Sequence, residues 1–277
     1  MLKLMYITNN TTVAKIAEDA GVDRIFIDME YIGKESRQSG LDTVKSHHTV
    51  KDVANVKSVL NKAEIVVRIN PVHDKDAKYC GTEEEIAKSI KAGADYIMLP
   101  MFKTKSEVMR FVSAVDKKAK TILLLETPEA VDNLDDILKT SGIDEIHIGL
   151  NDLHLAYKMK FMFQLLADGT VERIVTKIKA HGITFGFGGI ARIGYGILPS
   201  EYVIAEHYRL GSSMAILSRS FCDAAKIQDS KILNSLFCDE VMRIRQREIE
   251  VSRFDKLMFE TNKNEVVTLV DKIINSD

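Results

Sequence analysis

Short apolar segments of four to seven residues recur along the chain, and their alternation with longer segments is the feature that most limits the fold. Most of the intervening stretches show helical periodicity over about ten to fifteen residues, which is typical of βα units in a parallel sheet. The segments predicted to form strands are Leu2–Thr8, Arg24–Asp28, Ile65–Ile69, Tyr96–Leu99, Thr121–Glu126, Glu145–Ile148, Thr184–Phe187 and Met214–Leu217.

Eight such units favour a closed (β/α)8 barrel, the TIM barrel, over an open doubly wound sheet. The open sheet is disfavoured because no GxGxxG motif follows the first predicted strand. We expect one domain over residues 1–277, because this length suits a single large α/β domain. The residues from about 225 to 277 form a long C-terminal helical extension, which exceeds one outer helix. We therefore expect these helices to pack on a neighbouring subunit.

Composition and charge exclude several classes of function. Lys and Arg number 38 against 40 Asp and Glu, a net charge of −2 with no long basic block, so we expect no nucleic-acid partner. No apolar segment approaches the roughly 20 residues of a membrane span, so we expect no membrane insertion. The first ten residues lack a signal-peptide pattern, which favours a cytoplasmic protein. The 3 widely spaced cysteines do not suggest disulfides.

Charged side chains end four of the predicted strands. Asp28 and Glu30 lie in FIDMEY, Arg68 in VVRIN, Glu126 in LLLETP and Asp152 in GLNDLH. In a barrel of parallel strands, the C-terminal strand ends meet at one mouth, where active sites are built. A carboxylate that closes a fully apolar segment is costly to bury without a partner. We therefore expect these carboxylates to face water, a cation or a metal ion.

Two carboxylates from neighbouring strands are ligands that Mg²⁺ or Mn²⁺ prefers, and Glu126 and Asp152 supply such a pair. A 2-oxo acid offers its carboxylate and ketone as a chelate, while a metal and Arg68 would stabilise an enolate oxygen. A structural interpretation is equally open. In that interpretation Glu126 caps the helix that begins at Pro128, and Asp152 forms a loop turn.

Six segments, taken together, resemble the HpcH/HpaI aldolase and citrate lyase β-subunit family, which belongs to the phosphoenolpyruvate/pyruvate-domain barrels. Within residues 3–222 they are AGVDRIFIDMEYIG, VVRIN, AGADYIMLPMFKTKSEV, LLLETPEAVDNLDDIL, GIDEIHIGLNDLHL and LGSSMAILSRSF. The resemblance implies a barrel whose Mg²⁺, Mn²⁺ or Co²⁺ ion is held by Glu126 and Asp152. It also implies that Arg68 contacts the keto oxygen and carboxylate of a pyruvate-like substrate.

The same resemblance implies a carbon–carbon lyase or aldolase that works through a pyruvate or acetyl enolate, without a Schiff base. Its small-molecule partners would be a 2-oxo acid and an aldehyde or acyl substrate. It further implies a homo-oligomer that exchanges the last barrel helix, built from dimer units as a dimer, trimer or hexamer. We expect Gly149, Asn151 and Gly188 to join Arg68 in contacting the substrate. At Gly188 the missing side chain would let backbone N–H groups approach a carboxylate, although tight barrel closure explains this glycine equally well.

One departure from the family concerns the general base. Tyr31 stands where the aldolase branch usually has a histidine after its DxE motif. His48 or His47 is our candidate replacement, because an imidazole titrates near neutrality and can carry protons. An exposed pair of histidines ahead of the helix cap Thr49 is an equally good interpretation.

The two acidic residues of the second strand also receive alternative roles. We predict that Asp28 is structural and orients Arg68. Glu30 either accepts a hydrogen bond from bound water, as part of the catalytic group, or pairs with Arg68.

Three competing functions remain open. The short connection Val115–Lys120 before the fifth strand favours an acyl-CoA lyase of the citrate or malyl type. A Schiff-base aldolase would use Lys103, which follows the fourth strand. A catalytically inactive oligomeric barrel with a binding role is the third, because Tyr31 replaces the usual base.

Overall fold

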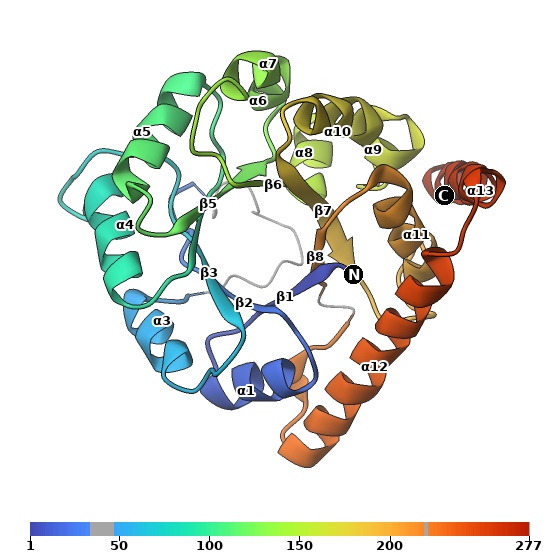
Figure 1. The fold of residues 1–277 in the computed structure, drawn as a ribbon, viewed down its shortest axis with the longest axis horizontal. Helices are drawn as coiled ribbons and strands as arrows, with labels where there is room; N and C mark the ends of the chain where they lie inside the picture. Colours follow the sequence, from blue (N-terminus) through green and yellow to red (C-terminus); the bar gives the residue numbers. More distant parts are fainter. Residues whose placement is uncertain (34–46, 219–220, 277) are drawn as a thin grey trace.

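The computed structural model describes residues 1–33, 47–218 and 221–276, and it confirms the predicted closed (β/α)8 barrel. The strands are parallel and follow one another around the barrel in chain order, with β8 pairing to β1 (Figure 1). Their bounds are β1 Lys3–Ile7, β2 Arg24–Asp28, β3 Glu64–Arg68, β4 Tyr96–Leu99, β5 Lys120–Leu125, β6 Glu145–Ile148, β7 Thr184–Ile190 and β8 Met214–Leu217.

The strand bounds agree with the sequence prediction to within one residue, apart from the end of β7. This strand runs on through Gly188 and Gly189 to Ile190. Glycine is rare in strands and has no side chain to show the apolar pattern of a strand, so the predicted strand ends at Phe187. The longer strand carries Gly188 further into the mouth of the barrel.

Helices surround the barrel on its outer face (Figure 1). They are α1 Thr11–Asp19, α3 Val50–Lys57, α4 Thr82–Lys91, α5 Lys105–Val115, α6 Pro128–Asp132, α7 Leu134–Ile137, α8 Leu150–Ala156, α9 Gln164–Ala167, α10 Thr170–Ala180, α11 Ser200–Leu210, α12 Ser230–Val251 and α13 Lys256–Asn275. A single 3-10 turn, η1, covers Ala224–Lys226.

The starts of these helices follow local side-chain chemistry. The Asn10 side chain accepts hydrogen bonds from the backbone of Thr12 and Val13 and so caps α1. Helix α4 begins without a side-chain cap. Thr82 is the first helical residue, after Gly81, and Glu85 bonds the buried Asn70 side chain at 2.8 Å.

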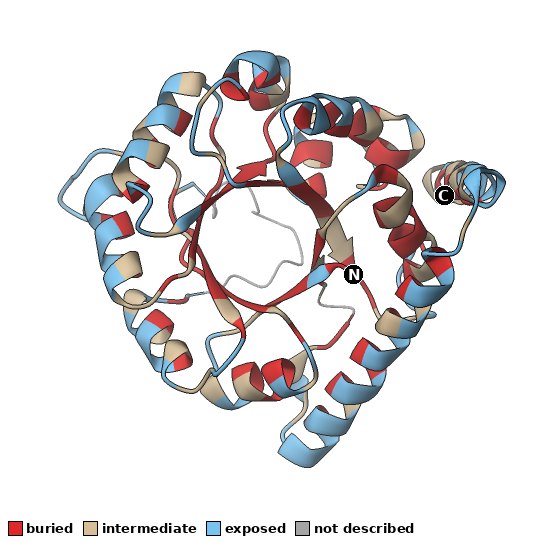
Figure 2. Cartoon of the chain, in the orientation of Figure 1, coloured by how far each residue is buried: buried red, intermediate tan, exposed pale blue. Residues whose placement is uncertain are grey.

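The core has two parts, one inside the barrel and one between the barrel and its helices. Figure 2 shows the strands as a nearly continuous buried ring. Inside the ring, Met5, Phe26, Val66, Met98 and Ile122 are among the side chains that fill the barrel. The barrel is therefore a packed core, open only at its mouth.

The N-terminal end of the barrel is closed by a buried ion pair. Arg24 on β2 donates two hydrogen bonds across the barrel to Glu145 on β6, at 2.7 and 2.8 Å. The guanidinium also lies over the Tyr96 ring, 4.1 Å from its centre. This end of the barrel therefore has fully matched charges.

The C-terminal extension packs against the barrel of its own chain. Helix α12 lies along α1 and α11, and α13 lies beside α11 and α9 (Figure 1). The fully buried Glu248 of α12 accepts hydrogen bonds from the Leu2 backbone and the Tyr208 hydroxyl, which ties the extension to β1 and α11. Whether another face of the extension meets a neighbouring subunit stays a prediction.

Replacement of Arg24 by methionine tests the importance of the buried pair. Arg24→Met would leave the Glu145 carboxylate buried without a cation, so we expect a loss of about 3–5 kcal/mol in the free energy of unfolding. The double variant Arg24→Met/Glu145→Met should recover most of that loss. Urea denaturation measures both values.

Arg110→Met is the matched control, because the pair of Arg110 with Glu83 is largely exposed. It should cost no more than about 1 kcal/mol. Equal losses for Arg24→Met and Arg110→Met would contradict the role given to the buried pair.

Candidate active site

Arg68 lies at the end of β3 and is held by Asp28 at the end of β2. Its Nε and Nη2 atoms donate hydrogen bonds to the two Asp28 carboxylate oxygens, each at 2.8 Å. The two residues are neighbours because β2 and β3 pair in register, with Asp28 opposite Arg68. Such a two-point pair fixes the plane of the guanidinium. The predicted orienting role of Asp28 is confirmed.

Glu30 provides a second carboxylate for Arg68. Its Oε2 atom lies 3.5 Å from Nη1 of Arg68, and Glu30 is buried. Burial by itself would lower the pKa of Arg68, but the charges of Asp28 and Glu30 outweigh this effect and raise it. Arg68 is therefore a permanent cation. The predicted pairing of Glu30 with Arg68 is confirmed, and its contact with bound water stays a prediction.

Glu126 follows β5 and is almost completely buried, with 3% of its surface exposed. Its Oε1 atom accepts one hydrogen bond, from the Met101 backbone at 3.1 Å. Burial raises the pKa of Glu126 well above its ordinary value, and the nearby Asp152 raises it further, while Arg68 opposes the shift. Among the described residues around Glu126, positive charge therefore does not balance the carboxylates.

Glu126 does not cap the helix after β5. The cap of α6 is Thr127, whose hydroxyl accepts a hydrogen bond from the Ala130 backbone. Asp152 lies in the first turn of α8 and not in a loop turn. Both structural interpretations considered from the sequence are therefore wrong, which leaves the two carboxylates available to a ligand.

Gly149 makes room for the Glu126 side chain. It precedes α8, and its N–H donates to the Leu125 carbonyl at 2.9 Å. A Cβ atom built on Gly149 would lie 2.8 Å from both Cβ and Oε2 of Glu126, much closer than real side chains approach. The absence of a side chain here is thus a steric requirement of the site.

A cavity of about 440 Å³ opens at this end of the barrel. Its lining includes the predicted site residues Arg68, Glu126, Gly149, Asn151, Asp152 and Gly188. The volume falls within the usual range of about 300–1,000 Å³ for small-molecule sites. The structure therefore brings the predicted metal ligands and substrate contacts to one cavity, although their roles stay predictions.

The two candidate bases are not among the described residues that line this cavity. His48 is buried, and its Nδ1 atom accepts a hydrogen bond from the Asp28 backbone at 3.0 Å. His47 is exposed and stacks on the Tyr31 ring, with 6.1 Å between ring centres. The Tyr31 hydroxyl in turn donates to the His48 carbonyl. This arrangement does not support either histidine as a base acting directly on a ligand in the cavity. Part of the loop that leads to them, residues 34–46, lies outside the described residues.

His147 is a cavity residue that sequence reasoning missed. It lies in the middle of β6, two residues after the inward-facing Glu145, and is almost fully buried. Its Nε2 atom lies 3.1 Å from the Gly188 carbonyl, which can only accept, so Nδ1 carries a lone pair. Nδ1 has no hydrogen-bond partner among the residues of known placement. Burial lowers the pKa of His147 to about 4.

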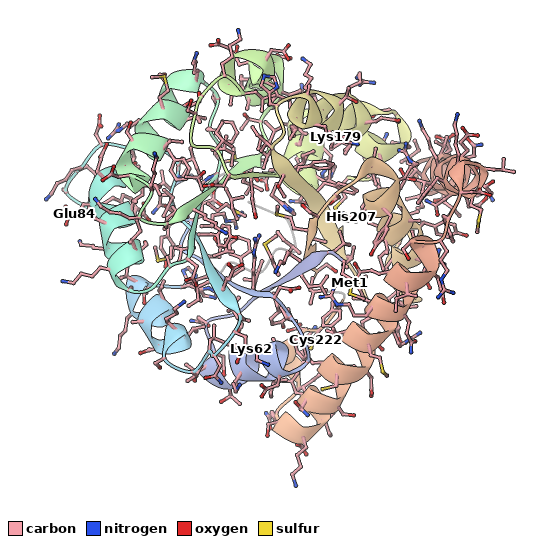
Figure 3. All side chains as sticks on the ribbon, viewed as in Figure 1. Met1, Lys62, Glu84, Lys179, His207 and Cys222 are labelled. Atoms are coloured by element: carbon pink, nitrogen blue, oxygen red, sulfur yellow. The ribbon has the colours of Figure 1, made fainter. Side chains whose placement is uncertain are left out.

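A second buried imidazole, His207, has a structural role. It lies on α11 against β7, outside the barrel (Figure 3), and stacks flat on Phe187 with 3.8 Å between ring centres. Its Nδ1 atom is 2.8 Å from the Ser212 hydroxyl, and burial lowers its pKa to about 3. His207 is therefore a neutral packing group beneath the strand that carries Gly188.

Lys103 does not lie in the cavity. Its ammonium group pairs with Glu129 at 2.7 Å on the exposed surface. A lysine that forms a Schiff base must reach the substrate, usually with a lowered pKa. The pKa of Lys103 is raised by Glu129, so neither position nor charge favours this role.

The residues fit a metal ion that shares its coordination with small ligands. The described part of the chain holds no group of three or more His, Cys, Asp or Glu side chains arranged to bind a metal. Glu126 and Asp152 would therefore supply two protein ligands, as is usual for Mg²⁺ bound together with an oxygen-rich substrate.

In the described ranges, no helix is both long and apolar enough to cross a bilayer.

Gly149→Ala tests the close contact between Gly149 and Glu126. The added Cβ would force Glu126 out of its position, so we expect a loss of about 1–3 kcal/mol in stability. The backbone φ of −81° suits alanine, so the loss would come from the contact alone. Gly81→Ala is a control with φ −67° and a nearest contact of 3.2 Å, and its cost should be smaller. Urea denaturation gives both costs, and a fully stable Gly149→Ala variant would contradict the packing described.

Comparisons with known proteins agree with the barrel fold. A comparison with curated protein sequences found no significant match. One similar solved structure is an HpcH/HpaI aldolase/citrate lyase family protein from Burkholderia cenocepacia J2315, with 16% sequence identity and a TM-score of 0.61 over 90% of this chain and 94% of that chain. Another is an HpcH/HpaI aldolase from Desulfitobacterium hafniense DCB-2, with 15% identity and a TM-score of 0.60 over 88% of this chain and 93% of that chain. The citrate synthase SbnG is also similar, with 18% identity and a TM-score of 0.57 over 88% of this chain and 93% of that chain. At these identities the likeness establishes the fold alone. The model of the HpcH/HpaI aldolase/citrate lyase family matches residues 3–187, and the chain belongs to this family.

Proposed function

We propose that the protein is a divalent-metal-dependent carbon–carbon lyase or aldolase that acts through the enolate of a pyruvate-like 2-oxo acid. The excess of buried carboxylate around a single guanidinium is the observation that carries this proposal. Glu126 is buried near Asp152, and its pKa is raised first by burial and then by the Asp152 charge, against the effect of Arg68. A divalent cation would supply that charge, and a 2-oxo acid would share its coordination.

The proposed metal ligands are Glu126 and Asp152, and the ion is Mg²⁺, Mn²⁺ or Co²⁺. When bound, such an ion acts as a Lewis acid toward the keto group of the substrate. Hard oxygen donors favour these ions over softer metals. Gly149 leaves the space in which the Glu126 carboxylate stands, as the 2.8 Å contact shows.

Arg68 is the proposed anchor of the 2-oxo acid. Two of its five N–H groups are donated to Asp28, so others remain for the oxygens of a ligand in the cavity. A guanidinium fixed beforehand by Asp28 and Glu30 does not need to reorganise when charge develops on an enolate oxygen. Asn151 and the backbone at Gly149 and Gly188 are the other proposed substrate contacts.

His147 is our revised candidate for handling protons. Its Nδ1 atom carries a lone pair without a partner among the described residues, but the atom is buried, so a substrate hydroxyl would reach it only after a shift of the cavity wall. A pKa of about 4 keeps this imidazole neutral near pH 7, so it acts as an acceptor and not as a stored proton. His47 and His48 would need a different loop arrangement to take this role.

An acyl-CoA lyase of the citrate or malyl type is the second candidate. The connection from α5 to β5 is short, since α5 ends at Val115 and β5 begins at Lys120. This connection leads into the start of a strand, so it lies at the end of the barrel away from the cavity and does not contribute to the cavity lining. An inactive barrel with a binding role is the third, and it predicts metal binding without proton exchange.

The first experiment follows loss of the pyruvate methyl proton signal by NMR in deuterated buffer with Mg²⁺ or Mn²⁺. Enolisation needs no second substrate, so the exchange tests the mechanism alone. We expect exchange that disappears with EDTA and falls at least about 100-fold in Glu126→Gln, because a ligand of the ion is lost.

Glu129→Gln is the matched control for this experiment, since Glu129 lies three residues away but is exposed and pairs with Lys103. It should retain full exchange. Exchange that persists in EDTA, or metal binding with no exchange at all, would contradict the proposed enolate chemistry.

We also propose that the C-terminal helices form a subunit interface, as part of a homo-oligomer. Large apolar side chains are exposed on the outer surfaces of α12 and α13, namely Ile232, Met242, Ile249, Leu257 and Met258. Clusters of exposed apolar residues commonly mark interaction sites.

Light scattering of the full chain at micromolar concentration tests the interface, and we expect a dimer or larger species. The variant Leu257→Glu/Met258→Glu should shift the population toward monomer, because it places two charges on the apolar surface. A monomeric parent protein would contradict this proposal.

A further inference from the structure

The cavity has two halves of different chemistry. The charged side chains come from the ends of β3 and β5 and from the start of α8, and they are Arg68, Glu126 and Asp152. The apolar lining comes from the connections between α8 and α9 and between β7 and α11. Its members are Phe161, Met162, Phe163, Ile197 and Leu198. The charged side chains thus follow β3, β5 and β6 and the apolar ones come from the connections after β6 and β7, so the two sets adjoin along the segment that follows β6.

The apolar half is a packed wall with an exposed edge. The rings of Phe161 and Phe163 meet edge to face, with 5.4 Å between their centres. Phe163 and Leu198 are nearly fully buried, whereas Ile197 is 73% exposed and still lines the cavity. An apolar ligand could therefore gain contact with Ile197 while resting against a wall that is already fixed.

The described residues that line this half include no lysine or arginine. Among the cavity-lining residues that the structure describes, Arg68 is the sole Lys or Arg side chain. It already forms salt bridges with Asp28 and Glu30. A carboxylate placed against Phe161 or Phe163 would lose water without gaining a cation, which is unfavourable. The volume of about 440 Å³ also exceeds what a three-carbon oxo acid fills.

We propose that the apolar half binds the body of the second substrate, an aldehyde with an uncharged aliphatic or aryl chain. This inference rests on the proposed function for its polar end, where the 2-oxo acid would bind. The new carbon–carbon bond would form between the two halves, joining C3 of the enolate to the aldehyde carbon. The aldehyde oxygen takes up the proton lost from C3, so atoms and charge balance.

The test is a binding measurement that needs no turnover. We would titrate the full chain, with Mg²⁺ present, with 2-oxooctanoate and with 2-oxooctanedioate, which differ by the terminal carboxylate. Each mimics a joined product, with a 2-oxo acid head and a long body. We expect 2-oxooctanoate to bind about tenfold tighter or more, and 2-oxohexanoate to bind roughly tenfold more weakly than 2-oxooctanoate because two methylenes are missing.

A charge-introducing variant makes the test sharper. Ile197→Arg should raise the affinity for 2-oxooctanedioate several-fold and lower that for 2-oxooctanoate, since a cation would then stand at the apolar half. Met109→Arg is the matched control, because Met109 is also exposed but lies on α5, outside both the cavity lining and the proposed subunit interface. It should leave both affinities unchanged.

The outcomes separate this inference from the proposed function. Equal or tighter binding of 2-oxooctanedioate by the parent protein, or no binding of either acid while pyruvate exchange persists, would overturn the apolar assignment. Loss of pyruvate exchange with the expected order of affinities would instead overturn the enolate chemistry and leave the apolar subsite standing. Exchange together with a preference for butanal over 4-oxobutanoate as co-substrate would support both.

Discussion

The pairing of one guanidinium with several buried carboxylates is the constraint on which this site depends. Closure of a parallel barrel brings the C-terminal strand ends together whatever residues they carry. Asp28, Glu30 and Glu126 are buried there, and the described cavity lining offers them Arg68 as its single permanent cation. Arg68 is consequently held firmly in place, and Glu126 is left with a strongly raised pKa.

Space at the site comes from residues that lack side chains. A Cβ on Gly149 would lie 2.8 Å from Glu126, and a Cβ on Gly188 would lie 2.8 Å from Leu150. Gly188 also has a φ of +51°, which favours glycine, and its carbonyl orients His147. The glycines therefore set the position of charged and polar groups as much as the charged residues do.

The sequence was sufficient for the barrel and for the charged residues at strand ends, because both follow from periodicity. Asp28, Arg68 and Glu126 each close an apolar segment, and parallel pairing places them at one mouth. His47 and His48 do not line the described part of the cavity, and the sequence could not predict their position because loop geometry has no such period. His48 turns its Nδ1 atom to the Asp28 backbone, a contact that no sequence pattern signals. His147 was overlooked because it lies within a strand, although the spacing of two from Glu145 already placed both on the inner face.

The two ends of the barrel show that charge balance, and not the mere presence of charge, separates a structural cluster from a functional one. At the N-terminal end, Arg24 bonds Glu145 at two points and also meets Glu64 at 3.3 Å, while Lys120 bonds Tyr96, so cations and carboxylates are matched. At the mouth, Asp28 and Glu30 already satisfy Arg68, so Glu126 and Asp152 add charge that the described side chains do not balance. Such an imbalance destabilises the folded chain unless a bound ligand supplies the opposite charge. The same interactions that close one end of the barrel therefore leave the other end suited to bind a cation and an oxygen-rich substrate.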